Sequence, residues 1–212
     1  MDDGSKSTEM TAKMLETETE HGVTRIVATP HFYPTKEAPD SFLERRKRSY
    51  AHLKSKYPDI PEIILGAEVL FYDGLSRSDR LDDFRIGNTN AILIEMPFSK
   101  WPSSVIDEIF DIADSGYTPI LAHIERYLNH HNKKILEELL TGSVMIQSNA
   151  EFFIDKKTRK TAFKMLERDM IHLLGTDCHN LTTRPPNIGE CLALADPHAF
   201  DRIEANARRL LG

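Results

Sequence analysis

The amino-acid sequence predicts an α/β fold in which parallel strands alternate with helices. Short apolar runs alternate with amphipathic stretches, and this strand–helix unit recurs roughly every thirty residues. Such a repeat places consecutive strands in parallel, joined by right-handed crossovers. No linker rich in Gly, Ser or Pro divides the 212 residues, of which 40% are hydrophobic. We therefore expect residues 1–212 to fold as a single domain around one core.

Six segments are expected as strands, because each is a short apolar run that ends at Gly, Pro or polar residues. A closed barrel would need more than six strands, so either a barrel or a curved sheet is expected. A polar segment, 73–85, separates the second strand from the third. The expected strands are 23–28, 63–65, 91–94, 118–122, 144–148 and 171–175.

The helices between these strands are expected from their end signals. Ser5 or Ser7 can cap the first helix, which Gly22 ends. Pro39 opens the second helix, and Gly116 ends the third. After the first, the expected helices are 39–57, 103–113, 135–140, 155–168, 188–195 and 197–211.

Charge and composition exclude several classes of partner. The 27 basic residues are scattered and outnumbered by 33 acidic ones, so nucleic acid and anionic membrane surfaces are not expected partners. No apolar run is long enough to cross a bilayer, and the N-terminal stretch is acidic and polar, unlike a signal peptide. We therefore expect a cytoplasmic protein without direct membrane insertion. Its two cysteines, Cys178 and Cys191, make neither a disulfide framework nor a zinc knuckle.

Ionisable residues stand at or just after the C-terminal ends of five expected strands. A barrel or curved sheet would bring these ends together at one mouth. Carboxylates gathered there would repel one another without cations, and mixed Glu, Asp and His ligation suits Mn, Fe or Zn better than Ca or Mg. Each residue taken alone also fits an ordinary loop or ion-pair role, so the prediction depends on their shared position. The candidate metal ligands are His31, Glu68, Glu95, His123, Asp177 and His179.

Two arginines closely follow candidate ligands, Arg126 after His123 and Arg184 after His179. Guanidinium groups are always charged and donate paired hydrogen bonds, which favours phosphate binding over the alternative of surface ion pairing. Two or three metal ions beside them would suit hydrolysis of a phosphate ester.

Cys178 supports a competing hypothesis, because five residues separate it from Arg184, as in the cysteine-dependent protein tyrosine phosphatases. Those enzymes need Gly in the intervening loop so that backbone N–H groups can wrap the phosphate. Residues 179–183 contain no Gly and include a candidate metal ligand. We therefore expect Cys178 to pack behind the strand instead of acting as a nucleophile.

Together these motifs resemble the polymerase-and-histidinol-phosphatase superfamily, and within it the bacterial capsule- and exopolysaccharide-associated tyrosine-protein phosphatases. They cover essentially the whole chain in order, and the two at the C-terminal end are the most specific. The motifs are Asp-Asp-Gly-Ser-Lys-Ser at 2–7, Ala-Thr-Pro-His at 28–31, Gly-Ala-Glu at 66–68, Leu-Ile-Glu at 93–95, Ala-His-Ile-Glu-Arg-Tyr at 122–127, and Thr-Asp-Cys-His-Asn at 176–180 with Arg-Pro-Pro at 184–186.

The resemblance implies a distorted, TIM-like β/α barrel of about seven strands that holds up to three metal ions, commonly manganese. It also implies hydrolysis of phosphotyrosine on a bacterial tyrosine kinase that controls polysaccharide assembly. By position, Glu68 would bridge two metals, Glu95 and His123 would complete the second, Asp3, His31 and His179 would hold the third, Asp177 would bind the first, and Arg126 and Arg184 would bind the phosphate.

The chain departs from the family pattern at its start. Family members carry a strand with His-x-His a few residues before Asp-Asp-Gly, whereas Met1 here directly precedes Asp2. We expect an N-terminally truncated domain that lacks the first strand and two ligands of the first metal; a genuine short form is the alternative. Fewer bound metals and impaired hydrolysis would follow, and exposed strand edges would favour a homo-oligomer. The alternative functions are a small-molecule phosphatase of the histidinol phosphate type and a catalytically inactive kinase-binding partner.

Overall fold

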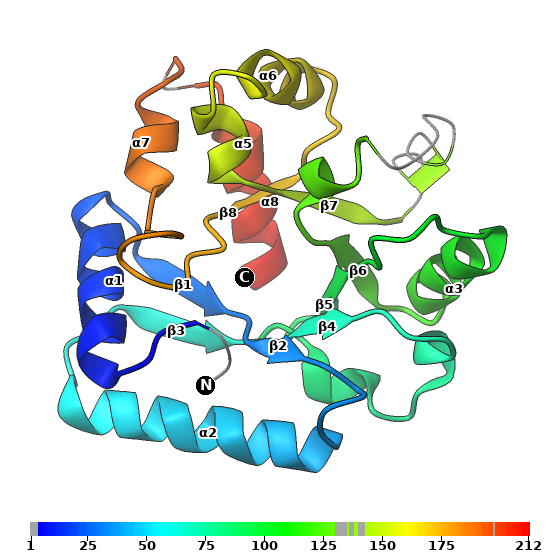
Figure 1. The fold of residues 1–212 in the computed structure, drawn as a ribbon, viewed down its shortest axis with the longest axis horizontal. Helices are drawn as coiled ribbons and strands as arrows, with labels where there is room; N and C mark the ends of the chain where they lie inside the picture. Colours follow the sequence, from blue (N-terminus) through cyan, green and yellow to red (C-terminus); the bar gives the residue numbers. More distant parts are fainter. Residues whose placement is uncertain (1–3, 130–134, 136–137, 140–142, 197) are drawn as a thin grey trace.

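Parallel strands form the centre of the computed structural model (Figure 1). The structure describes all residues except 1–3, 130–134, 136–137, 140–142 and 197. One sheet of the described residues has the strand order β2-β4-β5-β6-β7-β8, and a second pairs β1 with β3. Together the strands curl into a half-barrel. The barrel stays open, because no pairing among the described residues joins β8 back to β1. The strands are β1 Arg25–Ala28, β2 His31–Phe32, β3 Glu62–Leu65, β4 Glu68–Leu70, β5 Ala91–Glu95, β6 Thr118–Leu121, β7 Met145–Asn149 and β8 Leu173–Gly175.

Two of the six expected strands, 23–28 and 63–65, are each followed by a bend and a further short strand. The chain leaves β1 at Ala28 and resumes pairing as β2 at His31; in the same way it leaves β3 and resumes as β4 at Glu68. The backbone N–H of Gly66 donates to the carbonyl of Ala28 (2.9 Å), and that of Glu68 donates to the carbonyl of Pro30 (3.1 Å), so the two bends stay side by side. His31 and Glu68 therefore each lie just after the end of an expected strand, as predicted, and each also begins a short strand that was not predicted.

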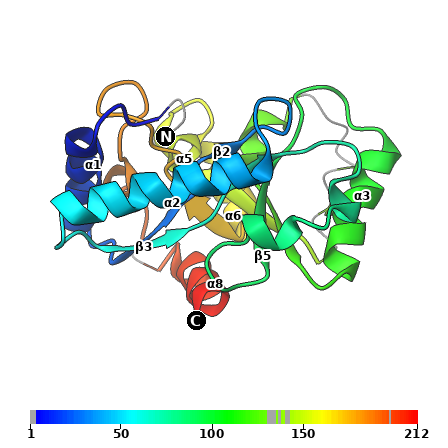
Figure 2. The same cartoon turned by 90° about the horizontal axis from the view of Figure 1, so that it is seen from below.

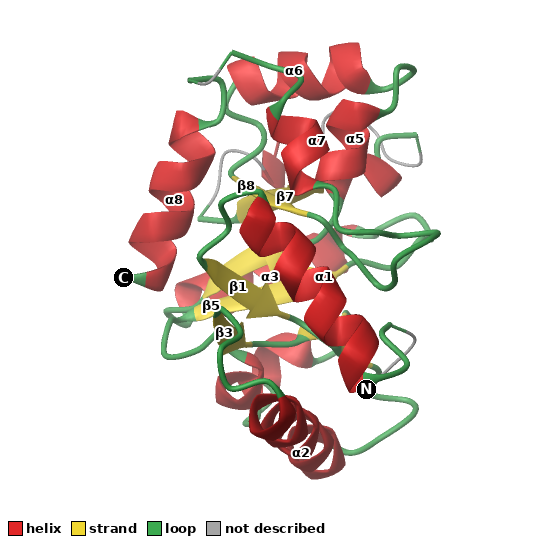
Figure 3. Ribbon diagram, turned by 90° about the vertical axis from the view of Figure 1, so that its left-hand side faces the viewer, coloured by secondary structure: helices red, strands yellow, loops and turns green. Residues whose placement is uncertain are grey.

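Helices cover the outside of the strands, with α5, α6 and α7 at one end and α2 at the other (Figure 3). Half of the expected helix 135–140 lies outside the described residues, and the described ones, 135, 138 and 139, are helical. The expected helix 155–168 is wrong in its start, because the chain forms two helices, α5 and α6, on either side of Asp155. No helix of the described residues is long and apolar enough to span a membrane. The helices are α1 Thr8–Glu20, α2 Pro39–Lys56, α3 Ser103–Asp114, α5 Ala150–Ile154, α6 Arg159–Glu167, α7 Ile188–Leu192 and α8 Asp201–Leu211.

The end signals act as expected at α1 and α2. The Ser7 hydroxyl accepts a hydrogen bond from the backbone N–H of Met10 (3.1 Å), and Gly22 supplies the left-handed residue after α1 with φ +87°. Pro39 occupies the first position of α2. The segment 73–85 is not purely a polar connection, because it forms two short 3-10 helices, Leu75–Arg77 and Leu81–Phe84, with buried apolar side chains.

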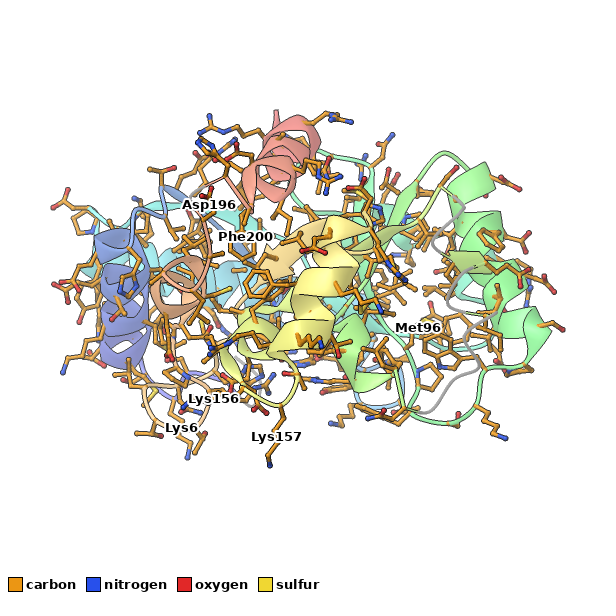
Figure 4. All side chains as sticks on the ribbon, turned by 90° about the horizontal axis from the view of Figure 1, so that it is seen from above. Lys6, Met96, Lys156, Lys157, Asp196 and Phe200 are labelled. Atoms are coloured by element: carbon orange, nitrogen blue, oxygen red, sulfur yellow. The ribbon has the colours of Figure 1, made fainter. Side chains whose placement is uncertain are left out.

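Strand β5 divides the core into two clusters. Ile92 and Ile94 belong to the larger cluster, which also holds Phe200, labelled in Figure 4, whereas Ala91 and Leu93 belong to the smaller one. Alternate side chains point to opposite faces of a strand, so both faces of β5 are buried.

The smaller cluster lies on the concave face of the curled sheet. Its buried residues come from β5, β6, β8 and adjoining positions, and Leu210 and Leu211 of α8 pack against them. Figure 2 shows α8 on the side of the strands opposite to the N-terminus. Glu95 lies two residues after Leu93 in β5 and so points to this same face. In β7, Gln147 and Asn149 lie two and four residues after Met145 and also point to it. The concave face thus changes from apolar to polar toward the carboxyl ends of the strands.

Candidate metal centre

Three candidate ligands from neighbouring strands converge at the carboxyl end of the sheet. The side-chain donor atoms of His31, Glu68 and Glu95 all lie within 4.8 Å of one another, and all three residues are buried. Strand register explains the convergence, because His31 pairs with Glu68 between β2 and β4 and Leu70 pairs with Glu95 between β4 and β5. Burial, and then the neighbouring charge of Glu68, raise the pKa of the Glu95 carboxyl.

His123 adds an imidazole to this cluster. It directly follows β6 in a left-handed backbone conformation with φ 36°. Its Nε2 lies 2.9 Å from Oε1 of Glu68 and 3.5 Å from Oε1 of Glu95. Its buried Nδ1 has no hydrogen-bond partner among the described residues. Buried carboxylates and imidazoles facing one another form a mixed oxygen and nitrogen donor set that fits a divalent cation of the Mn, Fe or Zn class.

Asp177 gathers the two arginines at the neighbouring side of the site. It lies two residues beyond β8, with φ 53°. Its Oδ2 forms short ion pairs with both Arg126 and Arg184 and accepts a hydrogen bond from Nδ2 of Asn149 (3.1 Å). A guanidinium nitrogen of Arg126 also lies 3.9 Å from Oε1 of Glu95, so this side chain reaches the metal-ligand cluster as well. The structure thus places Asp177 against the arginines, and its metal-binding role stays a prediction.

His179 connects the arginine side to His31. Its Nδ1 lies 2.9 Å from the backbone carbonyl of Asp177 and its Nε2 lies 3.0 Å from a guanidinium nitrogen of Arg184. A guanidinium can only donate, so in this arrangement Nε2 accepts from Arg184 and Nδ1 donates to the carbonyl. The rings of His179 and His31 are 5.5 Å apart. Asp3, the third residue expected at this metal, lies outside the described residues.

Comparison with known proteins identifies the family. The sequence model of the family described as Capsular polysaccharide synthesis, CpsB/CapC, matches residues 1–205. The chain belongs to the CpsB/CapC family. The tyrosine-protein phosphatase CpsB of Streptococcus pneumoniae is 30% identical over 202 residues, which cover 88% of this chain and 81% of CpsB. The tyrosine-protein phosphatase YwqE of Bacillus subtilis is 25% identical over 198 residues, which cover 91% of this chain and 78% of YwqE.

A solved structure supports the fold of this CpsB/CapC-family chain. It comes from crystal structures of YwqE from Bacillus subtilis and CpsB from Streptococcus pneumoniae, described as unique metal-dependent tyrosine phosphatases. The TM-score is 0.85 at 24% sequence identity, and the alignment covers 100% of this chain and 90% of the solved one. The expectation of an α/β fold with a distorted, incompletely closed parallel barrel is therefore confirmed.

Two side-chain amides that were not predicted as site residues, Gln147 and Asn149, link His123 to Asp177 in the CpsB/CapC-family site. Oε1 of Gln147 accepts a hydrogen bond from the backbone N–H of His123 (2.6 Å), and its Nε2 donates to Oδ1 of Asn149 (2.9 Å). Asn149 in turn donates to Asp177 (3.1 Å). A Cβ at Gly175 would lie 2.6 Å from Nε2 of Gln147, so the glycine in β8 leaves room for this amide. Their position toward the carboxyl end of β7 is the sequence feature that could have predicted them as site residues.

Two further residues hold the backbone around the site. Glu125 is a half-buried carboxylate whose pKa is raised by burial, and it accepts hydrogen bonds from Ser148 Oγ (3.1 Å) and the backbone N–H of Asn149 (3.2 Å). Arg46 of α2 donates to the carbonyl of Gly66 (2.7 Å), at the bend that precedes Glu68. Both residues therefore fix the strand ends from which the candidate ligands project.

The environment of Cys178 does not favour a nucleophilic thiolate. Burial raises the pKa of its thiol, and the nearby charges of Glu18 and Asp177 act in the same direction. Reactive cysteines have the opposite property, a lowered pKa in an electropositive site. The raised pKa thus agrees with the expectation that Cys178 is not the nucleophile, and its packing behind the strand stays a prediction.

Proposed function

We propose that this chain is a metal-dependent protein tyrosine phosphatase that acts on phosphotyrosine of a bacterial tyrosine kinase controlling capsular or exopolysaccharide synthesis. The observation that carries the proposal is the convergence of His31, Glu68 and Glu95 within 4.8 Å of one another, beside Arg126. Membership of the CpsB/CapC family and the names of its relatives support it. Residues 1–212 would act as one phosphatase domain, and manganese is the proposed metal, with iron or zinc as the alternatives.

Each group of side chains has a distinct proposed task. His31, Glu68, Glu95 and His123 would hold cations. His179 and, as the family resemblance implies, Asp3 would be further ligands. Divalent cations bound there would activate a water molecule and neutralise charge on the phosphoryl oxygens.

Arg126 and Arg184 would bind and orient the phosphate, because both guanidinium groups already point at one anionic oxygen, that of Asp177. The tyrosine hydroxyl has a pKa of about 10, so tyrosinate is a good leaving group and no strong general acid is required.

The cytoplasm is the proposed compartment, since both cysteines are free thiols and cytoplasmic proteins keep their thiols reduced.

An assay with a phosphotyrosine peptide tests the proposal. We expect EDTA to abolish hydrolysis, added manganese to restore it, and Cys178→Ser to leave it unchanged. The inverse pattern, with indifference to EDTA and loss of activity in Cys178→Ser, would establish cysteine chemistry instead. Turnover of histidinol phosphate in preference to the peptide would identify a small-molecule phosphatase. Kinase binding by a protein that hydrolyses neither substrate with manganese present would identify an inactive binding partner.

A further inference from the structure

An aromatic ring is exposed on the loop that follows the candidate ligand Glu95. Among the described residues, three large apolar side chains are exposed: Phe98 at 56%, Leu192 at 41% and Leu181 at 39%. Phe98 is the most exposed, although phenylalanine is usually buried. It lies on the loop that follows β5, three residues after Glu95.

The loop that carries Phe98 is fixed by two buried aromatic side chains. The hydroxyl of Tyr127 donates to the carbonyl of Met96 (2.8 Å), and Nε1 of Trp101 donates to the carbonyl of Pro97 (2.7 Å). Tyr127 and Trp101 are both buried, and their rings contact each other at 5.1 Å. Met96 itself is buried on the α3 side of the molecule (Figure 4). The exposed ring is therefore held on an anchored loop.

A sequence of ring contacts connects Phe98 to the candidate ligands. Its ring centroid lies 5.6 Å from that of Tyr127, which lies 5.7 Å from that of His123. Because Tyr127 is fully buried, Phe98 is the outer ring of this series and His123 is the inner one. Its ring is thus two aromatic contacts away from the cluster of Glu68, Glu95 and His123.

A second aromatic side chain, Tyr33, contacts the candidate ligand His31, but its ring is already in contact with other residues. Tyr33 stacks on His31 with centroids 5.4 Å apart and planes 6° apart, and the ammonium of Lys36 lies 3.7 Å from its centroid. Phe98 is different, because more than half of its surface is available to a ligand.

We propose that Phe98 is a specificity residue whose ring packs against the aryl ring of the substrate phosphotyrosine. The inference rests on the proposed function, since a phosphate held at the metal and arginine site leaves the aryl group of its ester to project toward the rim. Aromatic pairs favour offset or edge-to-face contact, which an anchored and exposed ring can offer without reorganisation. Phe98 would therefore favour aryl over alkyl phosphate esters.

Kinetics of matched variants test the contact. We expect Phe98→Ala to lower kcat/KM for a phosphotyrosine peptide by roughly 2- to 12-fold, mainly through KM, as expected for one aromatic pair. Phe98→Tyr keeps a ring and is expected to retain wild-type values. Leu192→Ala is the control, because Leu192 is exposed and apolar but lies on α7. Inhibition by inorganic phosphate, which has no ring, is expected to be the same in all four proteins.

Wild-type kinetics for Phe98→Ala would overturn the proposal, and so would an equal loss of phosphate inhibition, which would indicate a disturbed site instead of a lost ring contact. An inactive wild-type protein would refute the proposed function separately. Calorimetric binding of free phosphotyrosine and of inorganic phosphate then tests Phe98 without turnover. We expect the preference for phosphotyrosine to fall in Phe98→Ala; an unchanged preference would refute the contact.

Discussion

Replacing Gln147 by Leu tests the amide link between His123 and Asp177. Leucine is close to glutamine in size but offers neither the acceptor for the backbone N–H of His123 nor the donor for Oδ1 of Asn149. His123 is 1% exposed, so its N–H has no water in place of the lost partner. A buried unpaired donor costs about 1–3 kcal/mol and a lost neutral hydrogen bond about 0.5–1.5 kcal/mol, so we expect Gln147→Leu to lower the free energy of unfolding by about 2–4 kcal/mol.

Urea unfolding of the EDTA-treated protein measures this loss. Asn206→Leu is the matched control, because Asn206 donates one amide hydrogen bond to the carbonyl of His172 (3.1 Å), at the start of β8 and away from its carboxyl end. Its expected loss is about 0.5–1.5 kcal/mol. Calorimetric titration with manganese is expected to show weaker binding in Gln147→Leu only, because His123 is then less firmly placed. Equal unfolding free energies and equal manganese affinities in the two variants would refute the reasoning.

Three other predictions concern the charged groups of the site. Arg126→Lys keeps the charge but loses the forked contact, so kcat/KM for a phosphotyrosine peptide is expected to fall roughly 10-fold or more while manganese content stays the same; lower manganese content would contradict this. Glu95→Gln is expected to stabilise the metal-free protein to urea above neutral pH and to weaken manganese binding. Because the pKa of Glu95 is raised in the folded protein, the carboxyl costs stability as pH rises through that pKa, and the gain should vanish at low pH. Manganese at 100 times its dissociation constant should stabilise the protein by about 2.7 kcal/mol, measured as a higher Tm than in EDTA; an unchanged Tm would argue against a folded-state metal site.

The sequence predicted the strand ends well where burial gives a clear pattern. Strand β5 is buried on both faces, so it reads as a continuous apolar run, and Glu95 at its end is the first break in that run. His123 and Asp177 were predicted in the same way, because they are polar residues that follow the apolar runs of β6 and β8. The bends at Thr29-Pro30 and Gly66-Ala67 could not be predicted from periodicity, because they depend on hydrogen bonds between segments more than thirty positions apart in the chain, such as Gly66 to Ala28. His31 and Glu68 were therefore identified as site residues, but the short strands that they begin were not predicted.

The neutral amides of the site were missed for a different reason. Gln147 and Asn149 carry no charge, and a search for metal ligands and phosphate-binding cations does not select them. Their importance comes from the side chains that the sheet brings beside them, His123 from β6 and Asp177 from beyond β8. Partner choice across strands depends on register, which the sequence of one strand does not contain. The ion pairs between Asp177 and both arginines likewise became visible only with the structure.

The shared contact at Asp177 has a consequence for the proposed ligands. One carboxylate oxygen pairs with both Arg126 and Arg184. Under the proposed roles, a phosphate that bound the arginines would exchange with this internal anion and release Asp177 for a cation, and a cation that bound Asp177 would release the arginines for phosphate. Linkage would then require each ligand to raise the affinity for the other by the same factor. Substrate binding and metal loading would be coupled through this one carboxylate.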